Sequence, residues 1–158
     1  MFGPPDTGYV PAPSYAALQS PSVGAWCDLN PETGGTISVG LAAVGVIRIG
    51  WTGVPYYGWP STACSFSITL DAAVGSIVID GLGSFQQIAG ANMLLGLSPG
   101  SPIATDPGPV TFTVGGPHAG PAGHGMLYQL GPAGTLAGGV SGIVFMPNGA
   151  GNYDWSAY

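Results

Sequence analysis

Apolar and polar residues alternate along two successive segments between residues 64 and 80. A period of two places the apolar side chains on one face of a β-strand and the polar ones on the other. Residues 71–75 predict a turn between the two segments, so the pair is typical of an antiparallel hairpin with one buried face. The apolar positions expected in the core are Phe66, Ile68, Leu70, Ile77 and Ile79.

Shorter runs with the same period predict further strands, at residues 36–50, 92–97, 110–114, 126–130 and 142–146. The first run changes the parity of its apolar positions near Ala42 and Ala43, which indicates a bulge or a turn. Apolar residues of both parities over 44–49 favour a strand covered on both faces. In the third run, Phe112 and Val114 are expected to be buried. Glycine and proline signals predict loops at 26–35, 51–60, 99–109 and 115–125.

The fold class that follows is all-β: a β-sandwich or jelly-roll-like pair of sheets with about seven to nine short antiparallel strands. The chain has 158 residues, which suits one domain. Its 29 glycines and 16 prolines are interpreted as turns between strands, because the apolar residues form periodic blocks. We expect a Pro-rich extended N-terminal arm over 1–25, a β-sandwich domain over 26–147 and an aromatic C-terminal tail over 148–158.

Charge is scarce in this chain: it has seven acidic residues, one arginine and no lysine, for a net charge of −6. Nucleic-acid binding is excluded, since affinity for the phosphate backbone requires several basic contacts. Low charge together with 46% hydrophobic residues leaves little to keep copies apart, so we expect self-assembly into a homo-oligomer.

The N-terminal residues have neither a basic region nor an apolar core, so no signal peptide is predicted. The longest apolar run, 39–51, is too short to span a bilayer and includes Arg48, so no membrane partner is expected. Cys27 and Cys64 are open to two interpretations, one disulfide or two buried thiols, and the second suits a chain translated without a leader.

The residues that could bind a metal or catalyse a reaction do not match the pattern of any known metal or catalytic site. His118 and His124 are the only imidazoles, and a zinc site needs three or four ligands. Residues 139–143 end in isoleucine where a nucleophile elbow requires glycine. Carboxylate pairs flank two predicted turns, Asp71 with Asp80 and Asp28 with Glu32, and such pairs arise readily by chance. We therefore expect a non-enzymatic protein with no catalytic residues, no cofactor and no metal.

Aromatic residues gather in segments rich in glycine and proline, where they are candidates for an interface. They are Phe2, Tyr9, Tyr15, Trp51, Tyr56, Tyr57, Trp59, Tyr153 and Trp155. Those from Trp51 to Trp59 have three possible roles: a sugar-stacking platform, a protein interface or a lid on the core. The N-terminal aromatics are expected to anchor the arm, either on its own domain or on a neighbouring subunit.

These features predict a structural subunit of an assembly, by analogy with virion surface proteins such as the capsid decoration or cement proteins of bacteriophages. The expected partners are copies of the chain or another coat protein, and the expected location is a virion surface or another extracellular assembly. A subunit of an extracellular filament is the nearest alternative. A carbohydrate-binding module that recognises a surface glycan through the Trp51–Trp59 segment is the alternative from another class.

Overall fold

The computed structural model describes residues 22–87, 92–100, 106–123, 125–132 and 139–158. These residues form ten β-strands and two short 3₁₀ helices. The strands are β1 (Ser22–Trp26), β2 (Thr36–Ala43), β3 (Val46–Tyr56), β4 (Trp59–Asp71), β5 (Ser76–Asp80), β6 (Asn92–Ser98), β7 (Gly115–His118), β8 (Leu127–Pro132), β9 (Gly142–Pro147) and β10 (Tyr153–Ala157). The helices are η1 (Pro31–Thr33) and η2 (Leu82–Ser84). The prediction of an all-β sandwich is confirmed.

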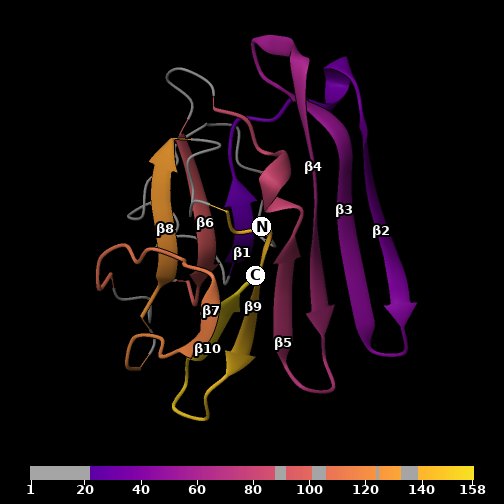
Figure 1. The fold of residues 1–158 in the computed structure, drawn as a ribbon. Coiled ribbons are helices and arrows are strands. Elements are labelled where there is room, and N and C mark those ends of the chain that lie inside the picture. Colours follow the sequence, from indigo (N-terminus) through magenta and orange to yellow (C-terminus); the bar gives the residue numbers. More distant parts are fainter. Residues whose placement is uncertain (1–21, 88–91, 101–105, 124, 133–138) are drawn as a thin grey trace.

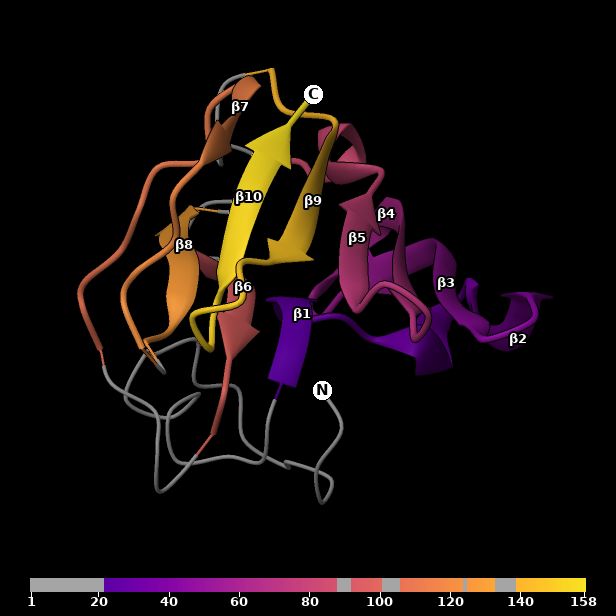
Figure 2. The same cartoon turned by 90° about the horizontal axis from the view of Figure 1, so that it is seen from below.

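Two antiparallel sheets of unequal width make up the sandwich (Figures 1 and 2). The larger has six strands in the order β10-β9-β5-β4-β3-β2, and the smaller has three in the order β1-β6-β8. The short β7 lies beside β10. Val114, the residue just before β7, forms an isolated bridge with Ala157 of β10. In both views β2 and β3 extend to one side, away from β6 and β8. The small sheet therefore covers only part of the large one.

The hairpin predicted between residues 64 and 80 is present as β4 and β5, in register from Ser67 opposite Asp80 to Asp71 opposite Ser76. The parity change near Ala42 and Ala43 is also confirmed. It corresponds to a register shift at the end of β2 and to the turn that leads into β3.

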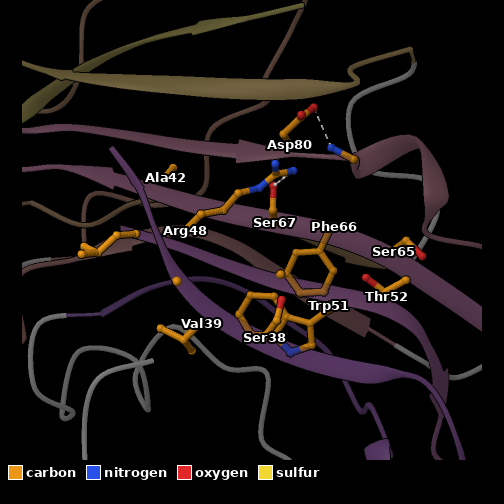
Figure 3. A pocket seen from close by; sticks show the side chains of 14 residues that line it. Ser38, Val39, Ala42, Arg48, Trp51, Thr52, Ser65, Phe66, Ser67 and Asp80 are labelled. Atoms are coloured by element: carbon orange, nitrogen blue, oxygen red, sulfur yellow. Dashed lines mark hydrogen bonds between the residues drawn. The ribbon is translucent and has the colours of Figure 1, made fainter. Parts of the chain in front are cut away.

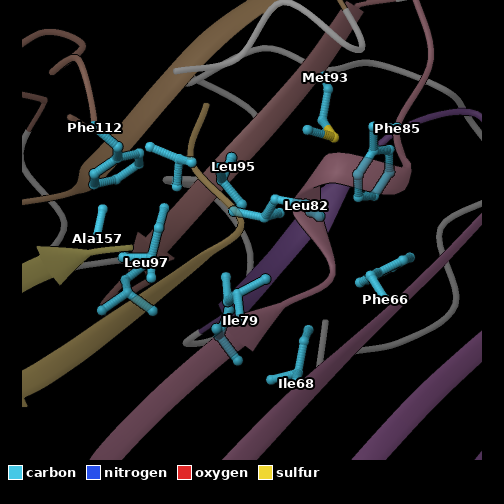
Figure 4. Packing of buried hydrophobic residues seen from close by; sticks show 14 of the residues in the cluster. Phe66, Ile68, Ile79, Leu82, Phe85, Met93, Leu95, Leu97, Phe112 and Ala157 are labelled. Atoms are coloured by element: carbon cyan, nitrogen blue, oxygen red, sulfur yellow. The ribbon is translucent and has the colours of Figure 1, made fainter. Parts of the chain in front are cut away.

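The core fills the space between the two sheets (Figure 4). Phe66, Ile68 and Ile79 from the large sheet face Leu95 and Leu97 from the small one, and all five are buried. Phe112 is completely buried, whereas Leu70 and Ile77 pack against the core while partly buried. The expectation that Val114 is buried is wrong, because its side chain is 61% exposed.

Four predictions of local structure are wrong. The segment 44–49 is not a strand covered on both faces, because Val44 lies in the turn before β3 and is 100% exposed, and Ile47 is 41% exposed. Residues 51–60 form a hairpin instead of a loop, because β3 continues to Tyr56 and β4 begins at Trp59, with register shifts absorbing the irregular residues. Residues 110–113 form no strand: the Phe112 amide donates to the Gln129 side chain at 2.9 Å instead of to a strand neighbour. Residues 115–118, expected in a loop, form β7.

The ends of the domain also differ in detail from the expected boundaries. β1 begins at Ser22, within the range assigned to the arm, and β10 lies within the range assigned to the aromatic tail. Both strands pair along their whole length, β1 with β6 and β10 with β9. The rest of the predicted arm, 1–21, lies outside the described residues.

Candidate interaction surface

One face of the six-stranded sheet is apolar from edge to edge. Residues directly opposite each other on neighbouring antiparallel strands share a face, so the register defines apolar rows that cross the whole sheet. The middle row runs from β2 to β10 through Val39, Ile49, Ile68, Ile79, Ile143 and Ala157. A second row runs through Leu41, Ile47, Leu70, Ile77, Phe145 and Trp155. A third, shorter row comprises Ile37, Trp51 and Phe66.

Burial along these rows falls sharply at β3 and β2. In the middle row Ile68 is 2% exposed, but Val39, two strands away, is 72% exposed. In the second row Phe145 is fully buried, whereas Leu41 is 77% exposed. The change occurs where the three-stranded sheet ends. We call the uncovered part, β2 together with residues 46–51 of β3, the wing.

The opposite face of the wing carries Arg48, the only arginine or lysine of the chain (Figure 3). Arg48 donates a hydrogen bond from Nη2 to Ser67 Oγ at 3.1 Å. The Asp80 carboxylate is on the same face and accepts from the Gly81 amide at 2.8 Å. A hollow of about 640 Å³ around Arg48 is lined by small and polar residues, among them Gly50, and also by the stacked rings of Trp51 and Phe66. The charged side chain of the wing therefore lies on the face opposite its apolar rows.

β2 is also an edge of the sheet, and all eight of its residues are exposed. Its sequence, TISVGLAA, contains no charge and no proline. Natural edge strands are usually protected from pairing with other chains by lysine, proline or a bulge. In β2 the only irregularity is the register shift between Leu41 and Ala43, next to the hairpin turn.

The predicted aromatic segment divides into buried and exposed members. Tyr56 is 1% exposed, and its hydroxyl accepts a hydrogen bond from the Gln86 amide at 3.3 Å. Trp51 stacks on Phe66, with ring centroids 4.4 Å apart. Tyr57 and Trp59, at the turn between β3 and β4, are 62% and 46% exposed. Two of the four rings are therefore available to a partner without rearrangement.

The C-terminal aromatics are mainly part of the core. Trp155 is buried and makes an edge-to-face contact with Phe112, with centroids 4.9 Å apart. Tyr153 is partly buried against the same core. The remaining members of the predicted interface, Phe2, Tyr9 and Tyr15, lie outside the described residues.

The groups considered for metal binding or catalysis are dispersed. Among the described residues no three His, Cys, Asp or Glu side chains lie close enough together to hold a metal ion. His118 stacks on Trp155, and His124 lies outside the described residues. Asp80 is opposite Ser67, four residues along β4 from Asp71, so the two backbones are about 14 Å apart at ~3.4 Å per residue. The Asp71 carboxylate accepts from the Ala73 amide at 2.8 Å, as in an Asx turn.

Both cysteines are buried free thiols. Burial raises the pKa of Cys27 well above its ordinary value, and the nearby Cys64 and Asp28 add to the effect. Burial raises the pKa of Cys64 to about 11. At neutral pH both are therefore neutral thiols rather than reactive thiolates.

Comparisons with known proteins identify no relative: no family model, no curated protein and no solved structure matches this chain. No helix among the described residues is long and apolar enough to cross a membrane. The wing is the feature that sequence reasoning missed. Its alternation of apolar residues predicted the strand, but alternation does not reveal whether another sheet covers the apolar face.

Proposed function

We propose that this chain is a non-enzymatic structural subunit that assembles with other protein surfaces through the wing. The observation that carries this proposal is the uncovered apolar face: Val39 and Leu41 are more than 70% exposed in rows whose other ends are buried. Covering such side chains contributes about 25 cal/mol per Å² of apolar area. Contiguous exposed apolar surface marks interaction sites in soluble proteins.

The low charge of the chain supports a permanent assembly rather than an encounter steered by charge. No acidic residue occurs from residue 33 to residue 70, so none of the seven negative charges of the chain lies on the wing. Interfaces of obligate assemblies are depleted in charge at their centre and rich in aliphatic and aromatic side chains. The wing has this composition on its apolar face.

Within this class we propose a virion surface subunit, as in the decoration or cement proteins of bacteriophage capsids, with copies of itself or another coat protein as partners. A small all-β domain with one apolar docking face and a polar outer face suits a protein that binds to a shell it does not build. The subunit of an extracellular filament is the alternative within the class. Electron microscopy of the purified chain distinguishes them, since a filament subunit forms open polymers by itself.

The test uses Ile47→Asp, which places a carboxylate on the apolar face of the wing but not on the edge strand. Ile47 is 41% exposed, so we expect the variant to fold, which circular dichroism would check. The matched control is Val74→Asp, at a residue that is 56% exposed in the turn after β4 and belongs to none of the apolar rows. We expect the control to co-sediment with the virions or filaments of its source as the wild type does, and Ile47→Asp to remain in the supernatant. Equal binding of both variants would refute the proposed docking face.

A carbohydrate-binding function is the second candidate, favoured by the exposure of Tyr57 and Trp59 on either side of one turn. Exposed aromatic rings supply flat apolar surfaces with a polar edge. A glycan array tests it: selective binding that Trp59→Ala abolishes and Ile47→Asp leaves unchanged would favour this function over assembly through the wing.

A further inference from the structure

The outer edge of β2 offers main-chain hydrogen-bonding groups to another strand. In an antiparallel sheet alternate residues of an edge strand direct their N–H and C=O groups away from the sheet. In the part of the chain that the structure describes, β3 is the only strand that pairs with β2. Because all eight residues of β2 are exposed, its free edge is accessible along its full length of about 27 Å, at ~3.4 Å per residue.

The sequence of β2 is complementary to itself when a second copy runs antiparallel to it. If Val39 faces Val39 of the other copy, Ile37 faces Leu41 and Ser38 faces Gly40. Every apolar residue of this central segment then faces an apolar residue, and every small or polar one faces its own kind. A shift by one residue would place apolar side chains opposite polar ones, so this pairing retains the two faces of the sheet.

We propose that two copies of this chain pair through β2 about a two-fold axis at Val39, which joins their six-stranded sheets into one sheet of twelve strands. This inference rests on the proposed assembly role and identifies the partner as the chain itself. Strand addition at an exposed edge is a common mode of recognition, and a two-fold interface requires one patch that matches itself. The apolar faces of both wings then lie side by side and form a single wider face.

Charge does not oppose this pairing. The nearest charged side chain is Arg48 on β3, which is opposite Gly40 and bonded to Ser67. In the pair, the two copies of Arg48 are three strand spacings apart, about 14 Å, which exceeds the Debye length of about 8 Å at physiological salt. The acidic residues lie outside the segment from 33 to 70.

Cysteine substitution tests the register directly. Directly opposed residues have Cα atoms about 4.5–5.5 Å apart, within the range of about 4.4–6.8 Å that a disulfide spans. We expect Val39→Cys to form a cross-linked dimer under mild oxidation, on the order of tenfold more than the exposed control Val74→Cys. Wild-type chain controls for Cys27 and Cys64, which are buried.

Ser38→Cys and Gly40→Cys provide a second, sharper readout. In the proposed pair, Ser38 is diagonal to Ser38 of the second copy, about 7–8 Å away, and Gly40 is likewise diagonal to Gly40. Ser38 of one copy is directly opposite Gly40 of the other. We expect neither variant to cross-link by itself and a mixture of the two to do so. Cross-linking of Val39→Cys no greater than that of Val74→Cys, or a mixture that fails to react, would overturn the proposed pairing.

Ser38→Lys separates this inference from the proposed function. Ser38 points to the polar face, so the variant adds charge along the edge and leaves the apolar face unchanged. In sedimentation velocity we expect wild type to be dimeric and Ser38→Lys monomeric, while the variant still docks on particles through Ile47 and its neighbours. A monomeric wild type would overturn the pairing and leave the docking face standing. A dimer that does not dock would support the pairing and refute the proposed function.

Discussion

The imidazole of His118 lies on the indole of Trp155, with ring centroids 4.1 Å apart and planes inclined by 25°. His118 Nε2 is buried and has no hydrogen-bond partner among the described residues. A buried polar atom left without a partner costs about 1–3 kcal/mol, whereas an apolar ring of similar shape retains the stacking without that cost.

His118→Phe is therefore expected to raise the free energy of unfolding by about 1 kcal/mol. His118→Ala, which loses the ring contact, is expected to lower it by about 1 kcal/mol. Urea unfolding followed by tryptophan fluorescence measures both. A less stable His118→Phe variant would contradict the prediction and indicate that Nε2 has a role of its own.

The uneven cover of the apolar rows predicts unequal costs for similar substitutions. Ile68→Ala removes buried methyl groups and leaves a cavity between the sheets, so the expected loss is about 2–5 kcal/mol. Val39→Ala, in the same row but 72% exposed, is expected to change the free energy of unfolding by less than about 0.5 kcal/mol. Urea unfolding at a protein concentration where the chain is monomeric measures the difference. Equal losses of unfolding free energy in the two variants would contradict the conclusion that the small sheet covers Ile68 but not Val39.

Gly96 and Gly24 are directly opposite each other in β6 and β1 but differ in their surroundings. Gly96 has a φ of +145°, and a Cβ atom there would lie 2.1 Å from the Leu127 carbonyl oxygen. A Cβ atom at Gly24 would meet nothing within 4 Å. Gly96→Ala is expected to cost about 3 kcal/mol, and Gly24→Ala less than about 0.5 kcal/mol. Thermal unfolding of the two variants checks the contrast, and a Gly96→Ala variant as stable as wild type would contradict it.

Stability is expected to fall in alkaline solution. Burial raises the pKa of Cys64 to about 11. Burial also raises the pKa of Tyr128 to about 12, and the Asp106 carboxylate, which accepts a hydrogen bond from the Tyr128 hydroxyl, adds to this effect. The unfolded chain releases these protons near pH 9 and 10, while the folded chain retains them. Raising the pH from about 9 towards 12 therefore favours the unfolded state, whereas below pH 9 these groups are protonated in both states.

Urea midpoints between pH 7 and pH 11 measure this decline, with the double variant Cys27→Ala and Cys64→Ala as the control. We expect the double variant to show a flatter decline between about pH 9 and 10, since tyrosine ionisation alone remains. Identical slopes for wild type and the double variant would show that the thiols do not contribute.

Deletion of residues 1–21 tests the expectation that the Pro-rich segment contributes to assembly. β1 begins at Ser22, so this boundary removes no described strand. We expect the shortened chain to retain its β-rich circular dichroism spectrum and to lose incorporation into particles, as measured by co-sedimentation. Incorporation at the wild-type level would limit the assembly surface to the folded domain.

Sequence periodicity predicted the elements where alternation is uninterrupted, as in β4 and β5 from Phe66 to Ile79. It failed where glycine and proline lie inside a strand. Pro55 pairs with Ala63 within β3 and β4, and the register shifts on either side of it accommodate the signals that indicated a loop. It also failed around Phe112. The Phe112 amide donates its hydrogen bond to the Gln129 side chain, so residues 110–113 alternate in sequence without pairing as a strand.

The candidate surface could not be predicted from the sequence, because the exposure of a strand's apolar face depends on whether the second sheet covers it. Ile37 and Ile79 have the same alternating surroundings in sequence, yet one is 49% exposed and the other fully buried. The difference is that the small sheet covers β5 but not β2. The aromatic residues show the same limit, since Tyr56 and Tyr57 are adjacent in sequence and differ completely in burial.

The uncovered rows also determine how an assembly built on them would respond to cold. Contacts between aliphatic side chains weaken on cooling, because the favourable entropy of removing apolar surface from water diminishes, while charge pairs that could compensate are absent from the wing's apolar face. Particles to which the subunit is held by Val39, Leu41 and Ile47 would therefore release it near 0 °C and bind it again on warming, with little response to dilute salt. Storage on ice would be the condition under which this subunit leaves its partners.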